Sequence, residues 1–191
     1  MRLRGVFSSM TVVNASALLS ANFFELLGLP QQFALDREHL SKRWRELQAQ
    51  VHPDRYVQAS ATEQRLAMQV ATRVNEAYQT LLHPLKRAVY LCELHAIALE
   101  LDSNTTMPQS FLLLQMTWRE ALAEAKAAGA APALMDLEGE IQTYRNQTYG
   151  ELADLIDQQR NYPAAASLIR QLFFIDKISQ EVTSALAQLE A

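Results

Sequence analysis

Residues 45–58 read RELQAQVHPDRYVQ, and the tripeptide at their centre, His52, Pro53 and Asp54, decides how the N-terminal half folds. The residues before it place apolar side chains four, three and four positions apart, which is the spacing of one helix face: Leu40, Trp44, Leu47 and Val51. Because Pro53 lacks a backbone N–H and disfavours helical geometry at the preceding residue, this helix is expected to end at His52. The tripeptide is therefore predicted to lie in a loop.

Capping residues indicate where the neighbouring helices begin. Asn22 with Glu25, and Ser60 with Glu63, have the spacing of a capping box, and Asp36 is a further N-cap candidate. The helix after the tripeptide has one apolar face: Leu66, Val70, Val74, Ala77, Tyr78 and Leu81. Two helices joined by a short loop pack antiparallel, so the tripeptide is expected at the tip of a helical hairpin.

The composition favours an all-α globular protein. Hydrophobic residues make up 49% and charged residues 20% of the 191-residue chain, with only 5 Gly and 6 Pro. A formal net charge of −4 argues against general nucleic-acid binding, which needs a basic surface. The chain contains no apolar run of the ~20 residues that span a bilayer, so no membrane segment is expected.

The chain is expected to form two domains. Polar residues around 101–107 predict a linker between an N-terminal domain, residues 22–100, and a C-terminal three-helix bundle, residues 108–191. The bundle helices are separated by breaks at 129–132 and 160–163. Residues 1–21 are interpreted as a flexible extension, with a mitochondrial presequence as the alternative because they carry two arginines and no acid.

The first helix of the predicted bundle has two apolar sides. One is the expected core face: Phe111, Leu114, Trp118, Leu122 and Ala125. The opposite side has apolar residues beside two acids: Leu112, Leu113, Met116, Glu120 and Glu124. Since a three-helix bundle buries one stripe per helix, this second side is expected to be exposed and to bind a partner. The alternative is that it packs against the N-terminal domain or the linker.

The residues offer little for catalysis or metal binding. Cys92 and His95 form a Cys-x-x-His pair, but a structural zinc site needs four ligands, so a buried structural cysteine in a reducing compartment is preferred. His52 as a general base beside Asp54 is the enzymatic alternative. No positioned nucleophile, phosphate-binding glycine loop or metal-ligand set accompanies them, so we expect no enzyme, no metal and no cofactor.

The chain resembles the HscB family over residues 22–191. The resemblance is carried by NFFELLGLPQQFALDREHLSKRWRELQAQVHPDRY, VNEAYQTLLHPLKRAVYL, SFLLLQMTWREAL and IRQLFFIDK. Members are J-domain co-chaperones of iron–sulfur cluster biogenesis. The resemblance implies a J domain that stimulates the ATPase of a DnaK-type chaperone, HscA, and a bundle that binds the scaffold protein IscU and presents it. It also implies a bacterial cytoplasmic location, with the mitochondrial matrix as the alternative.

The resemblance also implies roles for individual residues. The chaperone-binding residues would be His52, Pro53, Asp54, Lys42, Arg43 and Arg45. The scaffold-binding residues would be Leu112, Leu113, Met116, Glu120, Glu124 and Phe174. Leu114 and Thr117 depart from the family by standing where carboxylates can occur. Two non-enzymatic alternatives stay open: a generic J protein with other clients, and a nucleic-acid adaptor that uses the helix carrying Lys42, Arg43 and Arg45.

Overall fold

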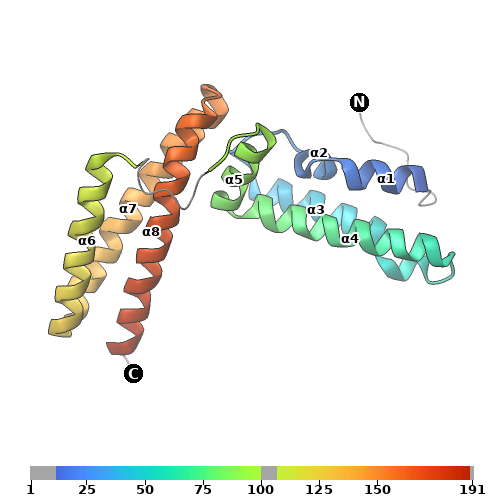
Figure 1. Cartoon of the computed structure of the whole chain (residues 1–191). Helices are drawn as coiled ribbons and strands as arrows, with labels where there is room; N and C mark the ends of the chain where they lie inside the picture. The colour runs from blue at the N-terminus through green and yellow to red at the C-terminus, as the bar shows by residue number, and fades with distance from the viewer. Residues whose placement is uncertain (1–11, 100–106, 190–191) are drawn as a thin grey trace. The chain divides into compact units, whose positions relative to one another are not determined.

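The computed structural model describes residues 12–99 and 107–189, and the regular elements in these ranges are helices, without a β-strand (Figure 1). The predicted all-α fold is confirmed. The chain divides into two compact units, residues 1–87 and 88–191, and the division falls inside helix α5 (Pro84–Leu94). The predicted linker lies outside the described residues except for Met107.

The first unit is built on an antiparallel pair of helices, α3 (Arg37–Val51) and α4 (Ala61–Leu82), joined through a short 3-10 turn, η1 (Pro53–Tyr56) (Figure 1). The short helix α2 (Phe23–Leu27) packs against both. The predicted capping boxes are present at α2 and α4, and the side chain of Asp36 caps α3 by accepting from the Glu38 N–H at 2.9 Å. The predicted helical hairpin is therefore confirmed.

The N-terminal segment departs from the sequence prediction. Residues 1–11 lie outside the described residues, but Val12–Ser20 forms helix α1, which packs on α4. Ala15 is fully buried and Leu18 is 8% exposed. The expectation of a flexible extension is thus wrong for residues 12–20, because two apolar side chains three positions apart on one face of α1 are buried by packing on α4.

Trp44 also differs from the prediction, which placed it on the buried face of α3. Leu40, Leu47 and Val51 are buried, but Trp44 lies half-buried at the edge of the hairpin. Its ring stacks on Tyr78 with centroids 4.5 Å apart, and its Nε1–H donates to Asn75 Oδ1 at 3.0 Å. An indole N–H requires a hydrogen-bond partner, and the edge of the hairpin supplies one.

The second unit contains a bundle of three long helices: α6 (Gln109–Ala128), α7 (Ala131–Ala153) and α8 (Tyr162–Leu189) (Figure 1). Gly129 ends α6 in a left-handed conformation with φ of 61°, and Pro132 lies in the first turn of α7. A turn of π-helix, η3 (Asp154–Gln158), ends α7 before α8. Trp118 is 1% exposed in the core, and its Nε1–H donates to Glu140 Oε1 at 2.8 Å.

Cys92 and His95 lie in the second unit, against the first residue of α8. The Cys92 thiol is fully buried and approaches the Tyr162 carbonyl oxygen at 4.0 Å, while the His95 ring stacks on Tyr162 at 3.7 Å. Burial, together with the nearby Glu93 carboxylate, raises the pKa of the Cys92 thiol to about 11. Such a thiol stays protonated and unreactive near neutral pH, as expected for a structural cysteine.

Candidate functional site

The tripeptide forms the exposed tip of the α3–α4 hairpin. His52 is the C-cap of α3 and Pro53 begins η1. The side chains of His52 and Asp54 are 54% and 85% exposed. Nδ1 of His52 accepts from the Asp54 N–H at 3.3 Å, and the same atom lies 3.4 Å from the Asp54 carboxylate. Nδ1 accepts in the first contact when it carries no proton, and it can donate to the carboxylate in the second when it carries one.

Side chains that follow the tripeptide hold this exposed turn in place. The Arg55 guanidinium donates to the Ala49 carbonyl at 3.2 Å, and the Tyr56 hydroxyl donates to the Gln50 carbonyl at 3.3 Å. Both carbonyls belong to the last turn of α3, where helical partners are missing. The side-chain amide of Gln64 donates to two further loop carbonyls, those of Val57 and Ala59, each at 3.0 Å. These hydrogen bonds preorganise the turn, although it has no hydrophobic core of its own. The sequence pattern did not predict this role of Arg55, Tyr56 and Gln64.

The cations of the predicted basic face of α3 differ in their contacts. Arg45 donates from Nε to the Ser41 carbonyl of its own helix at 3.3 Å. Lys42 and Arg45 are exposed and precede His52 by ten and seven positions, so all three follow one stripe of the helix. Arg43 instead donates from Nε to the Leu27 carbonyl at 3.0 Å and pairs with Glu46 at 2.8 Å. The contact with Leu27 ties α3 to the end of α2.

Gly28 makes the Arg43 contact possible. It ends α2 in the left-handed region with φ of 64°, and a Cβ at this position would lie 2.7 Å from Arg43 Nη2. A glycine therefore serves both the backbone conformation and the close approach of the guanidinium. Arg43 thus has a defined structural role in the first unit, which the sequence pattern did not indicate.

A groove of about 660 Å³ adjoins the turn on the flank between α3 and α4. Its lining includes His52 and Pro53 from the turn, Trp44 and Gln48 from α3, and Met68 from α4. The Met68 side chain is 61% exposed. The exposed turn, the stripe formed by Lys42 and Arg45, and this groove are thus on adjoining parts of the hairpin.

In the second unit, the outward side of α6 is exposed, as predicted. Leu112 is 36% exposed, and Leu113 and Met116 are each 58% exposed. Glu120 and Glu124 follow them at the exposed surface. We call these five residues the α6 patch. The opposite side of α6 is closed by its own core residues: Phe111, Trp118, Leu122 and Ala125.

Phe174 of α8 lies beside the same helix. It is half-buried and meets Phe111 edge-on, with centroids 5.9 Å apart. The guanidinium of Arg119 lies 5.2 Å from the centroid of the Phe174 ring, and also pairs with Glu181 at 3.8 Å. Sequence reasoning did not identify Arg119 or Glu181.

The two positions that depart from the family pattern differ from each other in the structure. Leu114 is half-buried and Thr117 is exposed. The Thr117 hydroxyl donates to the Leu113 carbonyl one turn earlier, at 3.3 Å, as threonines in helices commonly do. Neither residue carries a charge, so the acids beside the apolar part of the patch are Glu120 and Glu124.

Comparison with known families matches both parts of the chain. Residues 22–90 match the DnaJ domain, and residues 107–183 match a domain described as the HscB C-terminal oligomerisation domain. A J domain with an exposed tripeptide turn, followed by a helical bundle, defines the class of J-domain co-chaperones.

Individual relatives narrow the class. "Co-chaperone protein HscB homolog" of Ralstonia nicotianae is 45% identical over 171 residues, 90% of this chain and 97% of that protein. The chaperone HscB from Vibrio cholerae is 38% identical with a TM-score of 0.76, over 88% of this chain and 99% of that chain. The human co-chaperone protein HscB is 28% identical with a TM-score of 0.80, over 86% and 82% of the two chains. The chain belongs to the HscB family, which consists of co-chaperones rather than enzymes.

Two properties of the described ranges accompany this assignment. None of the helices in residues 12–99 and 107–189 is long and apolar enough to cross a membrane. Within the same ranges, no three His, Cys, Asp or Glu side chains come together as metal ligands.

Proposed function

We propose that this chain stimulates ATP hydrolysis by a DnaK/HscA-type chaperone and delivers an IscU-type iron–sulfur scaffold to it, aiding the maturation of iron–sulfur proteins. The observation that carries the proposal is the presence of two exposed surfaces of opposite character in one HscB-family chain. The tip of the hairpin, at His52, Pro53 and Asp54, is polar, whereas the α6 patch is apolar with an acidic border.

The hairpin tip suits an allosteric contact rather than chemistry. The Asp54 side chain is 85% exposed and accessible to a cation on the chaperone, while Pro53 and the Arg55 and Tyr56 hydrogen bonds preserve the shape of the turn. Binding there changes the chaperone's rate of ATP hydrolysis only if it favours one chaperone conformation over another.

Lys42 and Arg45 add long-range attraction to an acidic surface of the chaperone. Exposed charges of this kind raise the association rate more than the final affinity, and salt screens them. Arg43 contributes less to this attraction, because Glu46 compensates its charge and the Leu27 carbonyl holds its guanidinium. We therefore propose Lys42 and Arg45 as the main docking cations of the α3 face.

The α6 patch suits a protein partner. Leu112, Leu113 and Met116 bring flexible apolar side chains to the surface, and Glu120 and Glu124 supply a polar rim that fixes orientation. Phe174 extends the apolar surface from α6 to α8. An IscU-type scaffold is the partner that family membership favours.

The test is a steady-state ATPase assay of the cognate DnaK/HscA-type chaperone with this protein, with and without the scaffold. Stimulation by the protein alone and a greater than additive rate with the scaffold are the expected results. Stimulation that is indifferent to scaffold identifies a generic J protein with other clients. An unchanged ATPase rate under all conditions contradicts the proposal.

Self-association is a second candidate role for the bundle, because the matched family description names oligomerisation. Analytical ultracentrifugation over a range of protein concentrations separates the two roles. If a dimer dissociates when scaffold is added, the second copy of the chain and the scaffold compete for one surface. If the chain is a monomer, self-association does not compete with the scaffold for the α6 patch.

A further inference from the structure

The α6 patch has an aromatic neighbour on α8, and one cation connects them. Arg119 follows Leu112 and Met116 by seven and three positions, so it continues their stripe along α6. Its guanidinium lies over the Phe174 ring, at 5.2 Å from the centroid. The stripe of Leu112 and Met116 therefore leads through Arg119 to the aromatic side chain of the neighbouring helix.

The Phe174 ring is enclosed on two sides by α6. Phe111 meets it edge-on, and Arg119 covers it with a cation that is attracted to the ring face. Glu181 follows Phe174 by seven positions on α8. Its carboxylate pairs with Arg119 at 3.8 Å and orients the guanidinium. Arg119 and Glu181 are 50% and 38% exposed, so both stay accessible to a bound partner.

We propose that Arg119 is a positioning residue for scaffold binding, which presents the Phe174 ring next to the α6 patch, with Glu181 orienting its guanidinium. This inference rests on the proposed function and adds two residues to the surface that takes the IscU-type scaffold. Without Arg119, the ring loses the contact on one side and samples more rotamers, so part of the binding free energy is spent on ordering it again.

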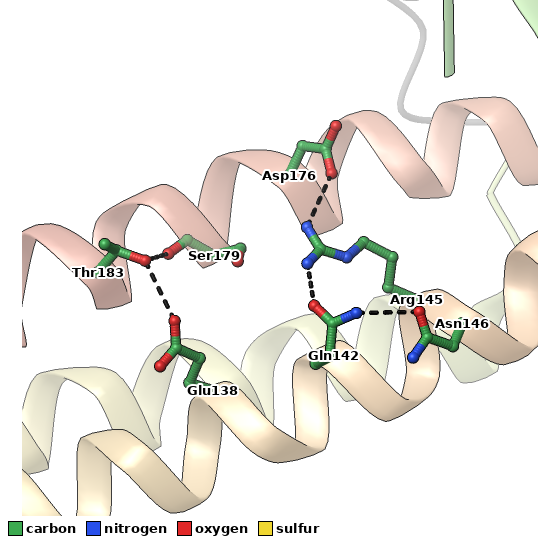
Figure 2. A network of polar contacts seen from close by, with 7 residues as sticks. All are labelled: Glu138, Gln142, Arg145, Asn146, Asp176, Ser179 and Thr183. Atoms are coloured by element: carbon green, nitrogen blue, oxygen red, sulfur yellow. Dashed lines mark hydrogen bonds and ion pairs between the residues drawn. The ribbon is translucent and has the colours of Figure 1, made fainter. Parts of the chain in front are cut away.

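A second interhelical ion pair offers a matched control. Arg145 of α7 pairs with Asp176 of the same helix α8 at 3.5 Å, and also donates to Gln142 (Figure 2). The neighbouring contacts are polar: Gln142 donates to Asn146, and Thr183 donates to Glu138 and to the Ser179 carbonyl (Figure 2). No ring contact is recorded for Arg145 among the described residues, so its loss removes an Arg–carboxylate pair on α8 without disturbing Phe174.

The experiment measures the dissociation constant for the cognate scaffold by isothermal titration calorimetry, using the full chain. Arg119→Met keeps the aliphatic stem and is expected to weaken binding about 3- to 5-fold. Arg119→Lys keeps the charge but loses the planar stack, so an intermediate affinity is expected. Arg145→Met should leave the affinity unchanged while lowering the melting temperature at least as much as Arg119→Met does.

A double-mutant cycle separates positioning from a general structural role. In a Phe174→Leu background, Arg119→Met should have no further effect on affinity, because the ring that it positions is gone. Additive losses, or equal losses for Arg119→Met and Arg145→Met, overturn the inference. If Arg119→Met lowers the fraction of folded protein, Arg119→Lys provides the same comparison with less disturbance.

Comparing two variants shows whether the role of Arg119 fails alone or together with the proposed scaffold surface. If alanine replacement of Leu112, Leu113 and Met116 abolishes scaffold binding but Arg119→Met has no effect, only the positioning role fails. If the triple variant binds the scaffold like the wild type, the proposed scaffold surface itself is wrong, and the role of Arg119 fails with it.

Discussion

The hairpin tip and the α6 patch are both exposed, but they are kept in place by different physics. The turn at His52–Asp54 has no core beneath it, and hydrogen bonds from Arg55, Tyr56 and Gln64 to nearby carbonyls hold its backbone. The α6 patch lies on a regular helix whose opposite side is fixed by buried aromatic and aliphatic side chains. Damage to the first surface should therefore act on function with little effect on stability, whereas the second tolerates surface changes only while its reverse side stays packed.

The largest expected effect is at the turn. His52→Gln should abolish stimulation of the chaperone ATPase and leave the melting temperature unchanged, because His52 is exposed and the other hydrogen bonds of the turn remain. Steady-state ATPase rates and thermal denaturation followed by circular dichroism provide the measurements. His39→Gln, at an exposed histidine of the same helix, is the control and should stimulate like the wild type. Stimulation retained by His52→Gln would falsify the assignment of the turn.

The two tryptophans, one in each unit, should contribute differently to the free energy of unfolding. Trp118→Ala removes a ring that is 1% exposed and is expected to cost about 3–5 kcal/mol of unfolding free energy. Trp44→Ala removes a half-buried ring at the edge of the hairpin and is expected to cost less, about 1–3 kcal/mol. Urea denaturation of both variants gives the comparison. Equal losses would mean that the edge position of Trp44 does not reduce its contribution.

The α6 patch should be functionally sensitive and structurally tolerant. Replacing Leu112, Leu113 and Met116 together by alanine is expected to weaken scaffold binding about 100-fold, since each truncation removes an exposed apolar contact. ATPase stimulation in the absence of scaffold should persist. The control is Met135→Ala on α7, which truncates a methionine that is 56% exposed and lies outside the patch. Titration heats unchanged from those of the wild type would show that the scaffold binds elsewhere.

The smallest effect concerns the start of α4, directly after the turn. Hydrogen bonds from the Ser60 side chain and backbone lower the pKa of the Glu63 carboxyl. Its contribution to stability is therefore present above the ordinary glutamate pKa and is lost as the pH falls through the lowered, folded-state value. Melting temperatures measured across the acid range should fall more for the wild type than for Glu63→Gln, and parallel curves would contradict this linkage.

Short-range patterns in the sequence predicted most of the first unit. The capping residues Asn22, Asp36 and Ser60 and the helix-ending Pro53 depend on local geometry, and the structure confirms each of them. The periodicity of α3 placed its buried residues correctly except for Trp44. Helix α1 was missed because its few buried side chains gain stability only by packing on α4, a contact that the segment does not encode by itself.

The exposed residues of the candidate site were predictable from the sequence, but the contacts of their neighbours were not. Projection of α6 onto a helical wheel correctly placed Leu112, Leu113 and Met116 at the surface, because the 3.6-residue period alone determines which side faces away from the core. The family resemblance grouped Arg43 of α3 with Lys42 and Arg45, although Arg43 is held by the Leu27 carbonyl and Glu46. Spacing along one helix cannot show that a cation is held by a partner from another helix.

The sequence by itself determined the helices other than α1, their capped ends, the exposed tripeptide turn and the membership in the HscB family. These depend on local backbone preference and on residue identity, which are present in every short segment. The tertiary structure decided which side chains support the two surfaces: Arg55 and Tyr56 beneath the turn, and Arg119 with Phe174 beside the α6 patch. Such contacts join residues from different elements, and they exist only after packing has fixed the distances between them.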